Sequence, residues 1–322
     1  MTLSLRPLYA QFLAWIETHN RPRTVAYYRS FLDRFVDAVG DVPIVELRKH
    51  HLLSWGRTWH ELQSVQRLFH WAHSEMELID RNPFATVKRP RPGRRRRVLQ
   101  RKEIAQLLRA AAPDFRAFLF AMRETIARPQ EVRALRWELL RWDSATHTRD
   151  AALIAGDARF ELHDYKARER RADPEAPRVI LVTARLGRLL SRLAAHGQHP
   201  DGFIFRNSEK RPWSSNAVRL RVKRLRKRTH LERDARGERL VAYTLRHSSA
   251  TSATINGVPD RVLAELMGHT STRTTARYQH LSVAHLRAAL ARLQTRVAPS
   301  CTPAVKVLTS CVTDPPICKP AS

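Results

Sequence analysis

Residues 242–251 read AYTLRHSSAT, and residues 263–280 read LAELMGHTSTRTTARYQH. These two segments carry polar side chains where neither a hydrophobic core nor a solvated surface calls for them. Gly268 stands where the end of a helix needs a left-handed residue, so we expect it to present His269 at the bend. Tyr278 follows nine residues later, after a short threonine-rich stretch with helical character. The pattern predicts a polar site beside the end of a helix.

Two earlier segments add basic residues. In residues 125–137, TIARPQEVRALRW, Arg128 stands directly before a proline at the start of an expected helix. Its guanidinium can face a phosphate there, or pair with Glu131 three residues on. Lys166 follows an expected strand in a chain that mostly uses arginine. Because an ammonium can release its proton near neutral pH and a guanidinium cannot, Lys166 is either a proton donor or a solvated hairpin lysine. Together the four segments predict a phosphoryl-transfer site.

In this order and spacing the segments resemble the tyrosine recombinases, or phage integrases, which break and rejoin DNA. The motifs of that family are an arginine in a TGxRxxE-like box, a hairpin lysine, HxLRH, LGH, and a tyrosine nine residues after that histidine. The resemblance covers residues 99–293, and residues 1–87 resemble the helical, SAM-like core-binding domain of the family. Five motifs in order are far more specific than any one of them.

The resemblance assigns roles to individual residues. It makes Tyr278 the nucleophile, Arg128 and Arg246 the phosphate clamp, Lys166 the general acid and His269 a further phosphate donor, with Tyr243 in the first HxLRH position and Glu131, His247 and His280 in support. Two positions depart from the family pattern, since Ile126 replaces a glycine and Tyr243 replaces a histidine. A phenol, with an ordinary pKa of about 10, shuttles protons less well than imidazole at neutral pH. We therefore expect altered acid–base support at Tyr243 and retained chemistry.

Attack on a phosphodiester needs a nucleophile, positive charge beside the non-bridging oxygens, and a proton for the leaving oxygen. The sequence offers groups for each, and the resemblance implies a 3′-phosphotyrosyl intermediate and a free 5′-hydroxyl. Because the covalent link conserves the bond energy, we expect no ATP and no other cofactor. The sequence holds no Walker loop, HExxH motif or carboxylate cluster with metal-ligand spacing, so no metal is expected either. The leading interpretation is a site-specific DNA recombinase of a mobile element or of chromosome-dimer resolution.

Three other functions fit part of the sequence. A catalytically impaired, integrase-like DNA-binding protein would bind DNA without forming a covalent adduct, with Tyr243 as the mark of decay. A type IB topoisomerase-like enzyme shares the arginine, lysine, histidine and tyrosine roles, and would relax supercoils as a monomer. A helix-turn-helix regulator would account for the helical first domain, but it leaves the ordered motifs after Arg97 without a role.

The charge of the chain favours a polyanionic partner. Its 322 residues include 58 lysines and arginines against 30 aspartates and glutamates, a formal net charge of +28. Arginine supplies 49 of these cations. GC-rich coding explains the high ratio of arginine to lysine as well as phosphate binding does, but it does not explain the net charge. We expect double-stranded DNA as the partner. The resemblance adds a homo-oligomer, a tetramer on paired sites, and admits accessory DNA-bending proteins.

Residues 88–97, KRPRPGRRRR, contain seven basic and no acidic side chains. With prolines, a glycine and no apolar side chain, this segment cannot pack into a core. It is expected either to cross solvent or to lie along a DNA backbone, and we favour the second. The expected DNA contacts are Lys88, Arg89, Arg91, Arg94, Arg95, Arg96 and Arg97.

The spacing of apolar residues predicts a mainly α-helical protein with a small antiparallel sheet, arranged as a two-domain DNA clamp. The expected parts are a core-binding domain at residues 1–87, a basic linker at 88–98, a catalytic domain at 99–296 and a flexible tail at 297–322. The first domain is expected to hold four or five helices, with Thr24 as an N-cap. In the second, the runs Ala152–Ile154, Phe160–His163 and Val179–Val182 predict the sheet, and helices are expected near Ile104, Phe118, Leu189 and Val222.

The ends of the chain add little. All three cysteines lie in the last 22 residues, at spacings that suit neither a zinc site nor a disulfide framework. The N-terminus lacks the features of a signal peptide, and no apolar stretch is long enough to span a membrane, so we expect a cytoplasmic, nucleoid-associated protein. Leucines of residues 282–293 share one helical face, which either packs on its own domain or, as in the family, docks on a neighbouring protomer.

Overall fold

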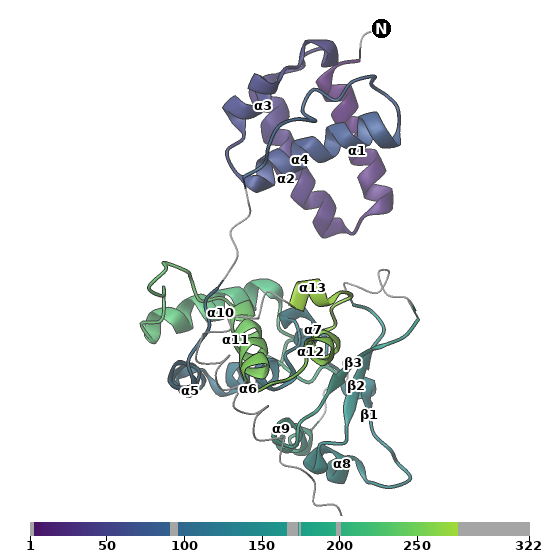
Figure 1. The fold of residues 1–322 in the computed structure, drawn as a ribbon. Helices are drawn as coiled ribbons and strands as arrows, with labels where there is room; N and C mark the ends of the chain where they lie inside the picture. The colour runs from purple at the N-terminus through teal and green to yellow at the C-terminus, as the bar shows by residue number, and fades with distance from the viewer. Residues whose placement is uncertain (1–2, 91–95, 166–172, 174, 198–200, 276–322) are drawn as a thin grey trace, which may run out of the picture. The chain divides into compact units, whose positions relative to one another are not determined.

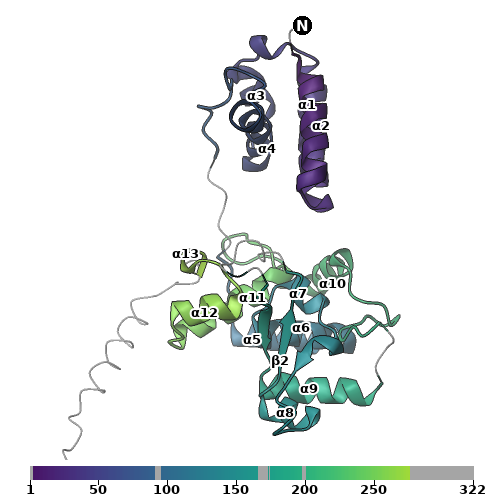
Figure 2. The ribbon, with the colours of Figure 1, turned by 90° about the vertical axis from the view of Figure 1, so that its right-hand side faces the viewer.

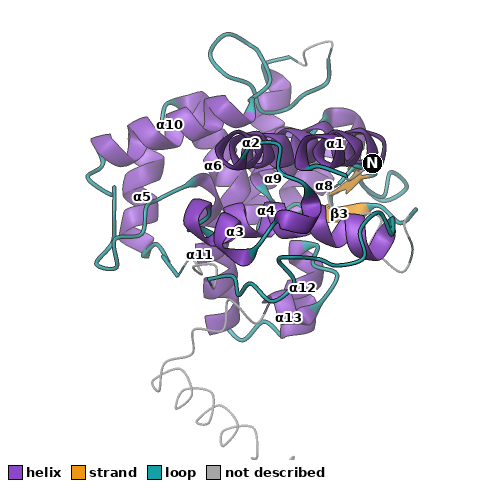
Figure 3. Cartoon of the chain, turned by 90° about the horizontal axis from the view of Figure 1, so that it is seen from above, coloured by secondary structure: helices purple, strands orange, loops and turns teal. Residues whose placement is uncertain are grey.

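The computed structural model describes residues 3–90, 96–165, 173, 175–197 and 201–275 (Figure 1). The chain forms two compact units, Met1–Arg95 and Arg96–Ser322, and each has its own hydrophobic core. Helices make up most of the regular structure, and the strands form one small patch (Figure 3). The prediction of a mainly helical fold with a small antiparallel sheet is confirmed.

The first unit is a helical bundle with an aromatic centre. Its elements are α1 (Leu5–His19), α2 (Pro22–Val39), η1 (Ile44–Glu46), α3 (Lys49–Trp55), α4 (Trp59–His70) and η2 (Trp71–Glu75). Phe12, Phe35 and Phe69 are fully buried there. The prediction of Thr24 as an N-cap is wrong, because α2 begins two residues earlier at Pro22. The fixed φ of proline suits the first helical position.

The second unit holds the predicted site. Its elements are α5 (Arg101–Ala110), α6 (Pro113–Thr125), α7 (Pro129–Arg133), η3 (Trp137–Leu139), β1 (Leu140–Arg141), α8 (Arg149–Ala155), β2 (Arg159–Leu162), β3 (Arg178–Leu181), α9 (Ala184–Ala195), α10 (Ser215–Arg228), α11 (Ala242–Ile255), α12 (Asp260–Met267) and α13 (Thr272–Thr275). Helices α5, α6, α9 and α10 follow the apolar repeats of the sequence. The buried side chains of α6, among them Phe118 and Met122, lie in the main core of the unit.

Strands β1, β2 and β3 form an antiparallel sheet in that order. Leu140 of β1 pairs with Phe160 of β2, which pairs with Ile180 of β3. These three apolar side chains are buried in the core. Leu162 of β2 pairs with Arg178 of β3, so a buried arginine lies in the same sheet as these apolar side chains.

The segment Ala152–Ile154, which the sequence predicts as a strand, lies in helix α8. Thr148 accepts a hydrogen bond from a backbone N–H of the first turn at 3.4 Å, and Gly156 ends the helix in a left-handed conformation. Capping at both ends thus overrides the short apolar run, which by itself fits a strand or a helix. The sheet takes β1 as a strand in place of residues 152–154. This strand has two residues, which are too few to show an alternating sequence pattern.

Helix α9 packs closely on α8, and the two helices lie side by side in Figure 2. The contact passes through Gly187, where a Cβ atom would lie 1.6 Å from the backbone oxygen of Leu153. Only a glycine permits this approach, so Gly187 sets the distance between the two helices.

Arg97 is an internal anchor of the second unit. Its side chain is 5% exposed and donates hydrogen bonds of 3.0–3.1 Å to the carbonyls of Leu231, Glu232 and Glu238. The Glu238 carboxylate also accepts from the backbone N–H groups of Arg96 and Arg97. The expectation of a DNA contact at Arg97 is therefore corrected, because three carbonyls already hold its guanidinium. Lys88, Arg89 and Arg96 are exposed, and Arg91, Arg94 and Arg95 lie outside the described residues.

Candidate active site

The site is built around the end of helix α12. Gly268 follows the helix with φ +62° and ψ +45°, the left-handed conformation that the sequence predicts. The N–H of Gly268 donates to the Glu265 carbonyl, and the N–H of His269 donates to the Ala264 carbonyl, both at 2.9 Å. The chain therefore turns sharply at Gly268, and His269 lies at the bend.

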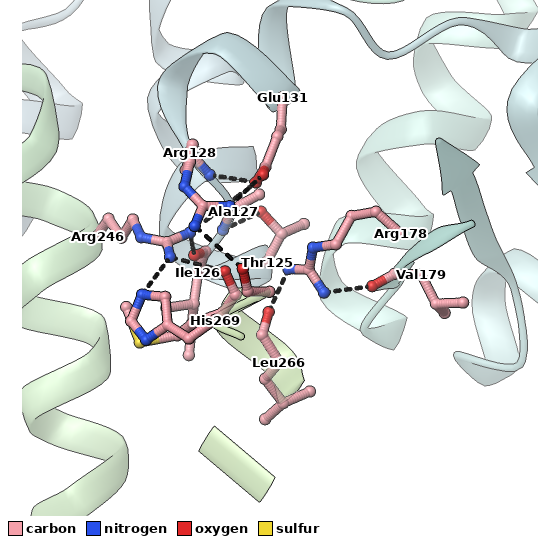
Figure 4. Close-up of polar contacts among 12 residues, drawn as sticks. Thr125, Ile126, Ala127, Arg128, Glu131, Arg178, Val179, Arg246, Leu266 and His269 are labelled. Atoms are coloured by element: carbon pink, nitrogen blue, oxygen red, sulfur yellow. Dashed lines mark hydrogen bonds and ion pairs between the residues drawn. The ribbon is translucent and has the colours of Figure 1, made fainter. Parts of the chain in front are cut away.

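Three arginines bind the four successive carbonyls of residues 265–268. Figure 4 shows Arg128, Arg178 and Arg246 converging there, with Arg178 bonded to Leu266. Arg178 donates to Glu265 at 2.8 Å and to Leu266, Arg246 donates to Met267 at 2.8 Å, and Arg128 donates to Gly268 at 3.0 Å. The last carbonyls of a helix have no partners within it and carry the negative end of its dipole. The end of α12 thus gathers guanidinium groups from three distant elements.

Arg128 and Glu131 are brought together by the first turn of α7. Arg128 is the N-cap residue, and its side chain donates to the Glu131 carboxylate at 2.6 Å. The second carboxylate oxygen accepts from the backbone N–H of Arg128 at 2.7 Å. The sequence left a phosphate contact and a pair with Glu131 open, and this structure shows the pair. The Arg128 side chain is 15% exposed, so it remains within reach of a ligand.

Arg246 lies beneath this pair and has no exposed surface. It projects from α11 and donates to the carbonyl of Ile126 at 2.5 Å. It also lies 3.9 Å from the buried carboxylate of Glu131. The charge of a buried cation needs such partners to offset its lost hydration. The carbonyls of Ile126 and Met267 and the charge of Glu131 therefore hold the guanidinium of Arg246 in place.

His269 is fixed from both sides. Its Nε2 lies 3.3 Å from a terminal nitrogen of Arg246, and its Nδ1 lies 3.0 Å from the hydroxyl of Thr275. A guanidinium has no acceptor, so Nε2 accepts from Arg246 and the neutral ring carries its proton on Nδ1. Thr275 is fully buried in α13 and sets the orientation of the ring.

Ile126 occupies a strained backbone position. It ends α6 with φ +53° and ψ +17°, a left-handed conformation that costs a non-glycine residue about 1–2 kcal/mol. Its side chain packs against the small cluster of Ala250, Leu263 and Met267. The departure from the family glycine therefore places a β-branched residue in a conformation that favours glycine, and its carbonyl receives Arg246.

The remaining predicted residues are placed differently. Tyr243 lies one turn before Arg246 on α11, is 40% exposed, and its ring centroid is 5.7 Å from the Arg246 guanidinium carbon. His247 is buried on the same helix. Lys166, Tyr278 and His280 lie outside the described residues, as do residues 282–293 and the tail from residue 297.

Sequence reasoning missed two residues of this site. Arg178 starts β3, and its only local signal is a charged residue at an inward-facing position of a strand. Thr275 belongs to a threonine-rich stretch in which no local feature marks one hydroxyl over another. Both residues meet their partners only through the tertiary fold.

The same unit carries a strongly basic surface on α10. Val218, Val222 and Leu225 of this helix are buried, while Arg219 and Lys223 are exposed. Beside the helix lies a hollow of about 290 Å³, which is lined by Lys223, Arg226, Lys227, Glu232, Arg233 and Arg239. One carboxylate among six charged residues leaves this hollow positive.

The described residues contain neither a membrane-spanning helix nor a metal-binding cluster. None of their helices is long and apolar enough to cross a lipid bilayer. The described part of the chain also contains no group of three or more His, Cys, Asp or Glu residues that could hold a metal ion.

Residues 97–285, more than half of the chain, match the sequence model of the phage integrase family. The chain belongs to the phage integrase family. The resemblance inferred from the motifs is thereby confirmed. The matched range includes the three arginines at the end of α12 and also His269, so the site lies within the integrase part of the chain.

Curated relatives within the integrase family match shorter stretches. Tyrosine recombinase XerC of Lacticaseibacillus casei (strain BL23) is 34% identical over 95 residues, which cover 30% of this chain and 30% of the relative. Tyrosine recombinase XerC of Mycobacterium bovis (strain BCG / Pasteur 1173P2) is 48% identical over 54 residues, which cover 17% of this chain and 18% of the relative. The chain therefore matches less than a third of the length of these relatives.

Solved integrase structures share the fold at low sequence identity. A lambda integrase dimer bound to a COC′ core site has a TM-score of 0.67 at 16% identity, covering 86% of this chain and 77% of that chain. The Tn1549 transposon integrase in complex with a circular intermediate DNA has a TM-score of 0.65 at 16% identity, covering 89% and 98%. These likenesses concern the fold.

Proposed function

We propose that the protein is a site-specific DNA recombinase that cleaves and rejoins DNA through a 3′-phosphotyrosyl intermediate. The observation that carries this proposal is the cluster at the end of α12, where Arg128, Arg178 and Arg246 converge beside His269. Named relatives of the chain are tyrosine recombinases, which supports the same function.

The charge balance of the cluster calls for an anion. Glu131 is buried and contacts Arg128 and approaches Arg246, so it offsets one of three positive charges. Glu265 on α12 is exposed, and solvent therefore screens its carboxylate. A phosphodiester bound at Arg128, beside His269, would offset one of the two remaining positive charges, and preorganised cations of this kind stabilise the charge that develops during phosphoryl transfer.

The reaction follows from the roles that the family motifs give to two further residues. The Tyr278 hydroxyl gives its proton to solvent and its oxygen attacks the phosphorus, so that a tyrosyl O–P bond forms and the bond from phosphorus to the 5′ oxygen breaks. Lys166 supplies the proton that the 5′ oxygen takes up. Rejoining reverses these steps with the 5′-hydroxyl of a partner strand, and the phosphotyrosyl bond conserves the energy needed.

Binding would rest on phosphate contacts from the basic surfaces. The exposed side chains of α10, the hollow beside it and the residues Lys88, Arg89 and Arg96 are suited to a duplex backbone. A lambda integrase dimer is bound to a core site, and a lambda integrase tetramer is bound to a Holliday junction. We infer that this chain likewise binds double-stranded DNA and assembles as a tetramer on paired sites.

Covalent capture tests the function directly. The native protein and a Tyr278→Phe variant, which lacks only the nucleophilic oxygen, are expressed in cells. DNA that stays attached through denaturation is then sequenced. We expect an enriched, shared DNA sequence with the native protein only.

Other outcomes would overturn the proposal in distinct ways. Salt-sensitive DNA binding with no adduct from either protein would favour the non-catalytic, integrase-like function, and adduct formation on Tyr243→His substitution would then locate the defect. Adducts that persist in the Phe variant would exclude Tyr278 as the nucleophile. Relaxation of supercoiled plasmid by the monomer, without a preferred sequence, would indicate the topoisomerase-like function.

A further inference from the structure

Arg178 is a buried arginine for which the family motifs provide no role. It is 1% exposed and lies on the inward-facing side of β3, next to the exposed side chain of Val179. Its guanidinium donates to the carbonyls of Val179 and Glu265, at 2.7 and 2.8 Å, and to that of Leu266. An apolar residue would fill the same space without the cost of burying a charge.

The surroundings of Arg178 make its positive charge unfavourable. Burial, together with the nearby positive charges of Arg246 and Arg128, lowers the pKa of Arg178 to about 10 against the opposing effect of Glu131. The guanidinium therefore stays charged at neutral pH, yet it is held beside two like charges. A purely structural filler would not require a third cation at this point.

Arg178 also determines the shape of the turn at Gly268. A Cβ atom on Gly268 would lie 2.5 Å from Nε and 3.0 Å from Cζ of Arg178, so the guanidinium packs directly against this glycine. The two carbonyls that Arg178 binds immediately precede those bound by Arg246 and Arg128. Any shift at residues 265 and 266 must therefore move the next two carbonyls and His269.

We propose that Arg178 is a positioning residue for strand cleavage. It holds the end of α12 so that the Gly268 carbonyl orients Arg128 and so that His269 meets Arg246. It also ties this turn to β3, the strand that follows the connection containing Lys166 in the sequence. This inference rests on the proposed recombinase function.

The test uses the full-length protein and the DNA sequence recovered by covalent capture. Arg178→Gln keeps a polar side chain of similar length without the charge, and Arg178→Lys keeps the charge with different donor geometry. Arg206→Gln is the matched control. Arg206 is a mostly buried arginine of the same unit that donates to the carbonyls of Phe203 and Lys210 away from the site.

We expect a split between binding and cleavage. A displacement of a catalytic group by about 1 Å can cost roughly 100-fold in rate, so single-turnover adduct formation should fall by about that factor in Arg178→Gln. The DNA dissociation constant should stay unchanged, and Arg178→Lys should recover part of the rate. Amide hydrogen exchange in residues 263–270 should quicken in Arg178→Gln, while Arg206→Gln should leave that segment and the cleavage rate unchanged.

The outcomes separate this inference from the function on which it rests. If the native protein forms no adduct, the recombinase function fails, and exchange in residues 263–270 still tests the contact itself. If the native protein forms adducts and both Arg178 variants form them at the native rate, the positioning role is wrong. Equal losses in DNA affinity and in cleavage, or an equal loss of rate in Arg206→Gln, would reduce Arg178 to a general stabilising residue.

Discussion

Substitution of Gly268 by alanine tests the tightest contact in the site. The backbone at Gly268 has φ +62°, and an added Cβ would lie 2.5, 2.9 and 3.0 Å from three atoms of Arg178. Arg178 is 1% exposed and its guanidinium donates to three carbonyls, so it has little room to retreat. The new methyl group must displace either the turn or the guanidinium.

Two costs add in this variant. A left-handed conformation costs a non-glycine residue about 1–2 kcal/mol. Loss of a buried hydrogen bond from a charged group costs about 1.5–3 kcal/mol, and at least one such bond must break when Arg178 moves. We therefore expect Gly268→Ala to lower the free energy of unfolding of the second unit by about 2.5–5 kcal/mol.

Gly197→Ala is the matched control for the backbone cost. Gly197 has φ +87° in the same unit, but nothing lies within 4 Å of an added Cβ, so its substitution should cost only about 1–2 kcal/mol. Urea unfolding of the full chain, followed by hydrogen exchange in peptides of residues 96–275, separates this unit from the first. A double-mutant cycle with Arg178→Ala should recover most of the excess cost. The reasoning fails if Gly268→Ala costs no more than the control, or if the cycle shows no coupling.

Four further variants each test a single residue. Gly187→Ala would place a Cβ 1.6 Å from a backbone oxygen of α8, so thermal unfolding should show a loss of at least about 3 kcal/mol. Lys223→Gln removes an exposed α10 cation and should reduce the slope of log K against log salt concentration by about 0.9 in DNA-binding titrations. Arg97→Gln should leave that slope unchanged and lower the free energy of unfolding by about 2 kcal/mol. Thr275→Val removes the hydrogen bond to His269, and the rate of adduct formation should fall about fivefold at unchanged DNA affinity. Unaltered adduct formation in this last variant would show that the hydroxyl does not orient the ring.

Several features of the site could be predicted because their physical causes are local. Gly268 takes the left-handed conformation that the end of a helix needs, and Arg128 stands at the start of α7 because a proline follows it. The apolar repeats predict the positions of α5, α6, α9 and α10. In each case the deciding interactions lie within a few residues of one another along the chain.

Local signals also misled where two of them competed. The apolar run at residues 152–154 fits a strand, but the caps at Thr148 and Gly156 made it a helix. Thr24 is a good N-cap residue, yet Pro22 started the helix two positions earlier. The sequence marks Ile126 only as a departure from the family glycine, whereas the structure places that residue in a left-handed conformation.

The sequence by itself determined the order of the motifs, the family and the helical character of both units. Only the tertiary structure decided how the arginines are used. Arg97 reads as one more cation of a basic run, yet it binds carbonyls 134 to 141 residues away. Arg178 reads as the start of a strand, yet it binds α12 across 87 residues of sequence. A guanidinium donates hydrogen bonds to any carbonyl or phosphate that the fold brings to it. The sequence therefore determines which groups an arginine can donate, and only the fold determines which acceptors receive them.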